Sequence, residues 1–173
     1  MKLHLCCGND YRAGWHNVDF YAHSADEKLD LSVFPWPYPD NTVDEIYIQW
    51  ALEHFDRPED LIREMHRVLK PGGLVRILVP HKDSLVACAP DHRYFFTRLF
   101  FGIFCDANNY YIRQHKCLFI EEEYRVKLLY GHWTPFDFIA SKYPVIWEKF
   151  SFSFFRPSTI EWAARKAIMP MDS

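Results

Sequence analysis

A strand–helix–strand unit spanning residues 43–79 is the feature that most constrains how this chain can fold. Residues 43–49, VDEIYIQ, are rich in side chains that favour strands. Asp56 then predicts a helix N-cap, because Pro58 falls in the first turn and a glutamate follows three positions after the cap. Apolar side chains follow at helical spacing: Leu61, Ile62, Met65, Val68 and Leu69. Residues 70–73, KPGG, end this helix, and residues 74–79, LVRILV, predict a second strand.

The N-terminal segment predicts further short strands of the same sheet. The apolar run 2–6 reads as a strand that stops at the turn 8–10, GND. A second strand is expected around Val18, ending at Asp19, and residues 29–31 are a candidate third. Strands that are almost continuously apolar predict a parallel sheet covered on both faces. The expected fold class is therefore α/β, with a Rossmann-like, mostly parallel, twisted sheet and helices on both faces.

The second half of the chain predicts helices followed by an antiparallel edge hairpin. Helices are expected over residues 94–104, over residues 121–130, where three glutamates suit a helix N-terminus, and over residues 134–141. The aromatic, β-rich run 145–155 and the segment 159–166 are expected to pair as antiparallel strands at the sheet edge.

Composition narrows the classes of protein and of partner. The formal net charge is −3, so the bulk charge gives no support for nucleic-acid binding. Five cysteines, an odd number in a chain that is not Cys-dense, favour a reduced, cytoplasmic setting. No apolar run approaches the ~20 residues that span a bilayer. Of the 31 aromatic residues, 21 fall after residue 80 and make a pocket or lid in that half plausible.

The expected binding site lies where the strands end. In open α/β sheets, ligands bind at the carboxyl ends of the strands, and these ends converge along one edge. Gly8 allows close approach of the backbone to a ligand, and Asp19 offers a carboxylate to ribose hydroxyls. Asp19 is only 11 positions after Gly8, which argues against an NAD site, where the acidic residue follows about 20 positions after the glycine turn.

A series of motifs resembles one enzyme family. In order and at family spacing, the chain carries CG at 7–8, GWHNVD at 14–19, DL at 30–31, PDNTVDEI at 39–46, LEH at 52–54 and RVLKPGG at 67–73. Together they resemble the small class I, Rossmann-like, type-11-like methyltransferases that use S-adenosylmethionine. The resemblance covers residues 3–80. The length and the lack of an internal linker predict a single domain over residues 1–173. We expect it to comprise a cofactor-binding half (1–80), a helical insertion or acceptor lid (81–142) and strands that complete the sheet (143–173).

The resemblance also implies roles for individual residues. The turn formed by Cys6, Cys7, Gly8 and Asn9 would pass under the methionine part of the cofactor. Asp19 would hold the ribose hydroxyls, and Asp30 with Leu31 would border the adenine. Gln49 and Trp50 would close the site beside the transferred methyl group.

Two positions depart from the family pattern. Cys6 stands where the family usually has glycine, and it would be strained if that position needs a positive φ. His4 stands where many class I enzymes have an acidic residue, so a possible anchor for the amino group of the cofactor is missing.

Methyl transfer needs alignment and exclusion of water more than a named catalytic group, although an acceptor that carries a proton would gain from a base. His81 is the preferred candidate base and His54 the second. The acceptor is expected to be a small molecule, and a homodimer is an open expectation. Position in the chain alone suggests these lining residues in the aromatic half: Tyr94, Phe95, His115, Tyr130, His132 and Trp133.

Three alternatives stay open at this point. The chain could be a catalytically silent binding or interaction module with a weakened cofactor site, which Cys6 and His4 favour. It could be an RNA methyltransferase, an idea that draws only on basic residues among the aromatics. Loose His/Cys spacings also suggest zinc at Cys88, His92, His115 and Cys117, but the spacing is not specific, and no metal is expected.

Overall fold

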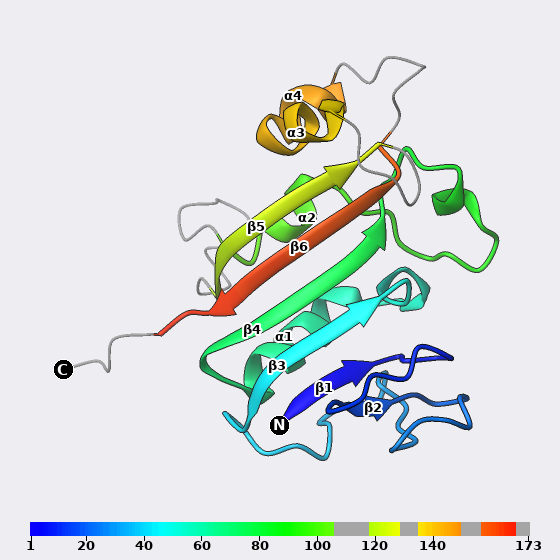
Figure 1. The fold of residues 1–173 in the computed structure, drawn as a ribbon, viewed down its shortest axis with the longest axis vertical. Coiled ribbons are helices and arrows are strands. Elements are labelled where there is room, and N and C mark those ends of the chain that lie inside the picture. Colours follow the sequence, from blue (N-terminus) through cyan, green and yellow to red (C-terminus); the bar gives the residue numbers. More distant parts are fainter. Residues whose placement is uncertain (106–117, 129–134, 150–156, 169–173) are drawn as a thin grey trace.

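The computed structural model describes residues 1–105, 118–128, 135–149 and 157–168. Within them, six strands form one sheet in the order β2-β1-β3-β4-β6-β5 (Figure 1). The strands are β1 (Lys2–Leu5), β2 (His16–Val18), β3 (Val43–Gln49), β4 (Leu69–Pro80), β5 (Phe119–Lys127) and β6 (Thr159–Lys166). Strands β2, β1, β3 and β4 pair in parallel, whereas β6 is antiparallel to both β4 and β5. The α/β, mostly parallel fold class with an antiparallel edge is confirmed.

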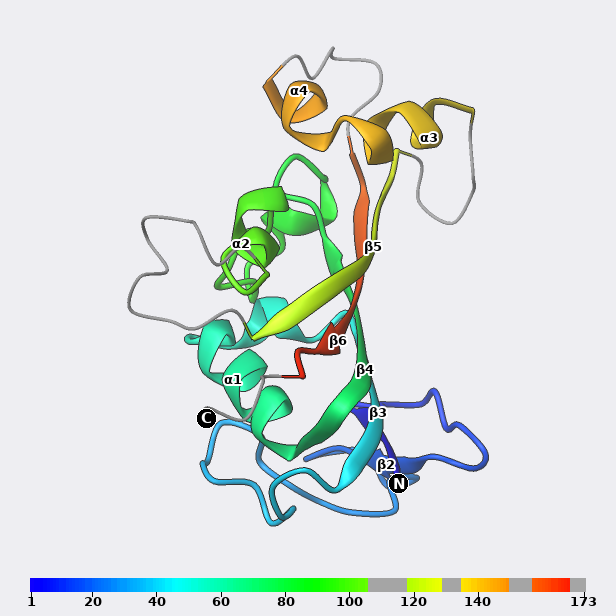
Figure 2. The ribbon, with the colours of Figure 1, turned by 90° about the vertical axis from the view of Figure 1, so that its left-hand side faces the viewer.

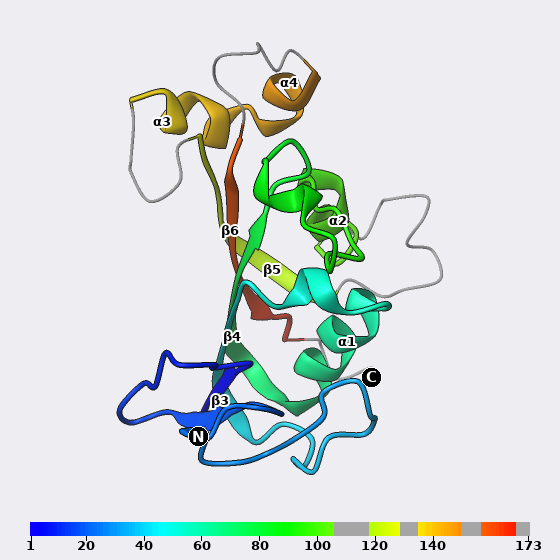
Figure 3. The same ribbon diagram turned by 90° about the vertical axis from the view of Figure 1, so that its right-hand side faces the viewer.

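The helices gather on one face and at one edge of this sheet. They are η1 (Leu52–His54), α1 (Pro58–Val68), η2 (Val86–Cys88), α2 (Arg98–Gly102), α3 (Pro135–Lys142) and α4 (Pro144–Lys149). Figures 2 and 3 show α1 and α2 on the same side of the sheet, with α3 and α4 beyond the ends of β5 and β6. None of the helices in the described ranges combines the length and the apolar character that crossing a bilayer requires.

One apolar core lies between the sheet and the helices on its covered face. Alternate residues of the strands point into it, such as Ile46 and Ile48 of β3 and Trp162 of β6, all almost fully buried. The loop between β2 and β3 contributes Trp36, whose indole N–H donates to the Leu31 carbonyl at 3.0 Å. This core fixes the covered face and leaves the strand ends free to form a site.

The opposite face of the sheet is covered by a loop and not by the helices that were expected. The crossover from β1 to β2 contains only residues 6–15 and no helix, although parallel strands are usually joined by a longer helical connection. Instead, this loop lies on the face away from α1 (Figure 3). The Arg12 guanidinium stacks 3.6 Å from the centre of the Tyr47 ring, and Trp15 packs against the same ring. Among the described residues, this loop takes the place of helices on that face.

Several expected elements in the second half were wrong. Residues 119–127 form strand β5 and not a helix, because their backbone pairs with β6 along its length. The expected strand at 145–155 begins instead as helix α4, and its remainder lies outside the described residues. The partners of β6 are therefore β4 and β5. The helix expected over 94–104 is reduced to α2, whereas α3 confirms the short helix expected near residue 135.

Two expectations in the first half also need correction. Asp56 does not cap α1: Arg57 occupies the N-cap position, and no side chain caps the helix. Both Asp56 carboxylate oxygens instead accept hydrogen bonds from Arg93. Residues 29–31 form no strand, because the chain there turns at Asp30 to follow the edge of the sheet.

Candidate functional site

A cavity of about 610 Å³ opens at the carboxyl ends of β1, β2 and β3. Its volume lies within the range of small-molecule sites, roughly 300–1,000 Å³. The lining residues come from five segments of the chain: Cys6, Asp19–Tyr21, Leu29–Ser32, Trp50–Ala51 with His54–Asp56, and Arg93. The strand ends thus converge as expected for an open α/β sheet.

Asp19 stands at the end of β2 and organises the surrounding loops. One of its carboxylate oxygens accepts from the Gly8 N–H at 2.9 Å, and the other accepts from Tyr21 and Ala22, both at 2.8 Å. Burial opposes ionisation, but the backbone donors of Ala22, Gly8 and Tyr21 outweigh it and hold the pKa of Asp19 below its usual value. A fixed negative charge therefore lies at the cavity wall.

Cys6 directly follows β1 and has a left-handed conformation, with φ of 50°. A non-glycine residue is uncommon there, so the position carries backbone strain. The side chain lines the cavity, and burial, aided by the Asp19 carboxylate, raises the pKa of the Cys6 thiol to about 12. The thiol is therefore neutral and narrows the cavity beside the glycine turn.

The far end of the cavity combines apolar and polar groups. Leu31 is almost fully buried, and Leu29 beside it is partly buried. Asp30 accepts from the Ser32 hydroxyl at 2.6 Å and from the Ser32 N–H at 2.9 Å, and these two bonds lower the pKa of Asp30. The local turn thereby presents Asp30 and Leu31 together at the rim.

Five of the nine residues expected around the cofactor line the cavity: Cys6, Asp19, Asp30, Leu31 and Trp50. The other four do not, namely Cys7, Gly8, Asn9 and Gln49. Cys7 is buried, and its N–H donates to the Val18 carbonyl at 3.1 Å. Gly8 has φ of 52° and acts on the site through its N–H bond to Asp19.

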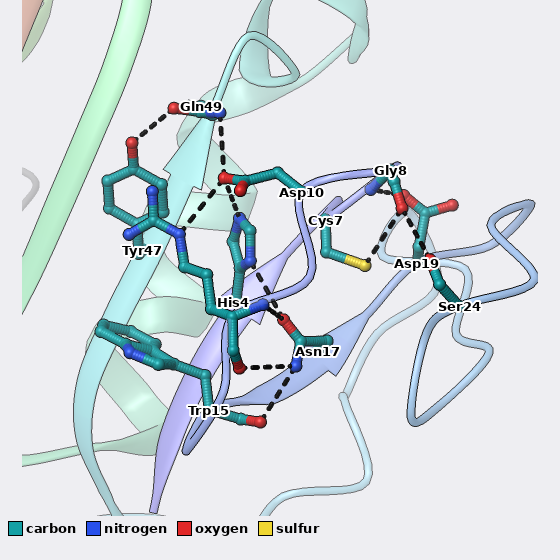
Figure 4. A network of polar contacts seen from close by, with 11 residues as sticks. His4, Cys7, Gly8, Asp10, Trp15, Asn17, Asp19, Ser24, Tyr47 and Gln49 are labelled. Atoms are coloured by element: carbon teal, nitrogen blue, oxygen red, sulfur yellow. Dashed lines mark hydrogen bonds and ion pairs between the residues drawn. The ribbon is translucent and has the colours of Figure 1, made fainter.

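Gln49 lies on the opposite face of the sheet. Its amide donates to Asp10 at 3.3 Å, and the Tyr47 hydroxyl donates to its carbonyl oxygen (Figure 4). His4 belongs to the same group: it is fully buried, its Nδ1 is 3.2 Å from the Asn17 amide oxygen, and it does not line the cavity. At the end of β3 it is Trp50, with φ of 51°, that turns into the cavity.

The two candidate bases differ in position. His54 lines the cavity. His81 is fully buried outside the lining, where its Nδ1 accepts from the Asp83 N–H at 3.1 Å. Its backbone lies between β6 and the segment before α2, because its N–H donates to Ser158 and Lys82 donates to Phe96. His81 therefore has no contact with a ligand in this cavity.

Sequence reasoning missed a cluster formed by Glu53, His54 and His92. Glu53 is 1% exposed, and burial raises the pKa of its carboxyl to about 7. It also missed Arg93, which lines the cavity while paired with Asp56. The LEH motif was the only signal in the sequence for this part of the site. Nothing in the sequence indicates that residues 92–93 lie beside residues 53–54.

Other candidate residues contribute little to the described cavity. Cys88 is exposed and lies outside the cavity lining, and Tyr94 packs against Phe96 and Phe100. Phe95 is exposed. The remaining lid and zinc candidates lie outside the described residues: His115, Cys117, Tyr130, His132 and Trp133.

Comparison with known proteins relates part of the chain to one family. A family model described as a methyltransferase domain matches residues 14–77. Over this segment the chain is similar to methyltransferase domains. The methyltransferase match contains Asp19, Asp30, Leu31, Gln49 and Trp50 and begins after the turn 6–9.

Curated relatives match part of the chain. A ubiquinone/menaquinone biosynthesis C-methyltransferase of Azotobacter vinelandii is 48% identical over 48 residues, which are 28% of this chain and 19% of the relative. The corresponding enzyme of Pseudomonas fluorescens is 42% identical over 62 residues, covering 36% and 21%. The chain thus spans about a fifth of the length of the curated relatives it matches.

Solved structures show the fold. An S-adenosylmethionine-dependent methyltransferase from Archaeoglobus fulgidus superposes with a TM-score of 0.60 at 16% identity, covering 95% of this chain and 85% of that one. Another from Mesorhizobium loti has a TM-score of 0.55 at 16% identity, covering 95% and 90%. The fold is that of the class I, Rossmann-like methyltransferases.

Proposed function

We propose that this chain binds S-adenosylmethionine in the cavity at the strand ends and transfers its methyl group to a small-molecule acceptor. The observation that carries the proposal is the position of Asp19 and Leu31. Both lie within the methyltransferase match, and both line one cavity of about 610 Å³ at the carboxyl edge of the sheet.

The donor set fits such a cofactor. The two Asp19 oxygens accept three backbone N–H groups, whereas a carboxylate offers about four acceptor positions, so one can still accept from a ribose hydroxyl. Leu29, Leu31 and Phe55 supply apolar surface against which an adenine ring can pack. When bound, the cofactor supplies an activated methyl group. The protein then aligns the acceptor and excludes water, and this positioning can lower the barrier without a dedicated catalytic base.

Calorimetric titration with S-adenosylhomocysteine tests this proposal. We expect saturable binding to the wild type and a loss of affinity of at least about tenfold in Asp19→Asn, because a charge-assisted hydrogen bond to the ribose is weakened. Asp44→Asn is the matched control, since Asp44 lies outside the cavity and pairs with Lys70.

Asp19 also organises loops, so a second variant is needed. Leu29→Trp places a larger side chain at a partly buried position of the cavity wall, and it should weaken binding while the circular dichroism spectrum is kept. Absence of binding by the wild type at millimolar ligand would overturn the proposal.

One observation favours a second candidate, a binding module that has lost catalysis. The neutral thiol of Cys6 occupies a left-handed position on the cavity wall, where the family usually has glycine. A wild type that does not bind S-adenosylhomocysteine, together with a Cys6→Gly variant that does, would support this candidate.

A further inference from the structure

A cluster of three potential metal ligands lies beside the cavity. Glu53 and His54 belong to η1, and His92 lies in the loop after η2. The two segments are held together because the N–H groups of Arg93 and Tyr94 both donate to the Glu53 carbonyl, at 2.8 and 3.2 Å. As a result, one ligand atom from each of the three side chains lies within 4.8 Å of the others.

Two polar atoms in this cluster are buried without a hydrogen-bond partner among the described residues. They are Oε2 of Glu53 and Nδ1 of His92. Glu53 is 1% exposed, so a carboxylate oxygen is withdrawn from water with nothing to compensate it. Unpaired buried polar groups are costly, which indicates that something absent from the polypeptide completes this cluster.

Each imidazole of the cluster offers one nitrogen to a ligand. Nδ1 of His92 is the unpartnered nitrogen of that ring. Nδ1 of His54 is 3.3 Å from the Asp91 carbonyl oxygen, which can only accept, so Nε2 of His54 carries the lone pair. Histidines that ligate metals almost always donate their other N–H to a carbonyl or carboxylate in this way.

We propose that Glu53, His54 and His92 form a zinc site. Two imidazoles and one carboxylate are the donor set of several catalytic zinc sites, in which the fourth position is open to water or substrate. Zn–N distances of 2.0–2.1 Å place tetrahedral ligands about 3.3 Å apart. The ligand atoms, which lie within 4.8 Å of one another, would therefore approach by up to about 1.5 Å. Rotation of the two imidazoles, which are less buried than Glu53, supplies that movement.

The position of the site suggests its role. His54 both belongs to the cluster and lines the cavity, so a bound cation would lie next to any ligand there. Resting on the proposed methyl transfer, this placement favours acceptors with a hydroxyl or enol oxygen, because a zinc ion lowers the pKa of a bound oxygen acid.

Titration of the chelator-treated full chain with zinc chloride, with no cofactor present, tests the site by itself. We expect one equivalent to bind, and a loss of affinity of at least 100-fold in Glu53→Gln and in His92→Gln. His23→Gln, which replaces an exposed histidine outside the cluster, should bind like the wild type. Cobalt in place of zinc should give the visible absorption of a tetrahedral site, and His92→Gln should abolish it.

The outcomes separate this inference from the proposed function. Zinc binding that is absent, or unchanged in His92→Gln, would overturn the site whatever the cofactor does. If Glu53→Gln fails to fold, His92→Gln still tests the site, because His92 is partly exposed and its replacement should leave the fold intact. Zinc binding without any binding of S-adenosylhomocysteine would leave the site in place and overturn the methyl-transfer proposal alone.

Discussion

Cys6 combines backbone strain with a place in the cavity wall. Its φ of 50° suits glycine, and its thiol lines the cavity. We predict that Cys6→Gly binds S-adenosylhomocysteine about three- to tenfold more tightly, because removal of the thiol widens the cavity. The same change should stabilise the fold by about 1 kcal/mol, because left-handed strain is relieved. Calorimetry and urea unfolding measure the two effects.

Cys6→Ala separates the two causes. Alanine removes the thiol but keeps a Cβ at the same positive φ, so we expect part of the gain in affinity and none of the gain in stability. A Cys6→Gly protein that binds more weakly than the wild type would show that the thiol contacts the ligand favourably.

At this scale the sequence predicted some site residues and not others for geometric reasons. Asp19 was predictable because it directly follows strand β2 and because the residues around it belong to the segment that matches the methyltransferase model. Gln49 and Trp50 were predicted together, yet consecutive residues of a strand point to opposite faces, so only one could face the cavity. His92 was not predictable as part of the Glu53 cluster, because 39 positions separate the two.

The polar contacts of Glu64 hold helix α1 against the loop between β2 and β3. Glu64 is 8% exposed and accepts from the Trp36 N–H at 2.7 Å and from Arg67 at 2.6 Å. We predict that Glu64→Ala lowers the free energy of unfolding by about 2–4 kcal/mol, because a buried N–H and a guanidinium lose their partner. Asp56→Ala should cost less than about 1 kcal/mol, since its pair with Arg93 is exposed and it caps no helix.

Urea unfolding followed by circular dichroism measures both variants. Equal losses in Glu64→Ala and Asp56→Ala would contradict this reasoning, because they would mean that Asp56 supports the helix start after all.

His66, near the end of the same helix, predicts a dependence of stability on pH. Burial, together with the ammonium group of Lys166, lowers the pKa of His66 from 6.5 to about 4. The unfolded chain therefore binds a proton more readily than the folded one, so stability is complete above pH 6.5 and falls as the pH drops toward 4. Across this window the loss should be about 1–3 kcal/mol.

His66→Leu should flatten this pH dependence, whereas the exposed control His23→Leu should leave it unchanged. Denaturant unfolding at pH 7.0, 5.5 and 4.5 measures the difference. The prediction is wrong if His66→Leu and the wild type lose the same free energy over this range.

The errors in element type come from tertiary pairing. The three glutamates at 121–123 resembled a helix N-terminus, but Glu121 binds Arg98 and the Trp162 indole, while Glu122 binds Arg165 of the neighbouring strand. The charges of Glu121 and Glu122 therefore serve contacts with α2 and β6. Local pattern alone could not reveal this, because the partners lie 23–43 positions away.

At the scale of the whole molecule, local patterns predicted that the first strands pair in parallel, but they did not predict the pairing of β6 with β4 and β5. The order β2-β1-β3-β4 was not predicted either, because β1 lies between β2 and β3 and not at the edge of the sheet. Strand β6 inserts between β4 and β5, so its neighbours depend on contacts formed across most of the chain length.

This insertion makes the two halves of the chain share one core. Trp162 on β6 is 1% exposed, stacks on Phe101 of α2 at 5.0 Å and contacts Phe119 of β5 at 5.6 Å. The same cluster extends to Leu3 of β1. We therefore predict that Trp162→Ala destabilises the entire chain by about 3–5 kcal/mol, as expected for removal of a large buried ring.

The decisive measurement is whether this loss appears in a single transition. If the chain has one core, near-UV and far-UV circular dichroism should report the same unfolding midpoint as each other, in the wild type and again in Trp162→Ala. The midpoint of the variant should be lower than that of the wild type. Leu99→Ala on α2 is the control, because Leu99 is 69% exposed and should change stability by less than about 0.5 kcal/mol. Two separate transitions, with only the second sensitive to Trp162→Ala, would mean that the cofactor half folds by itself and that the single-domain prediction is wrong.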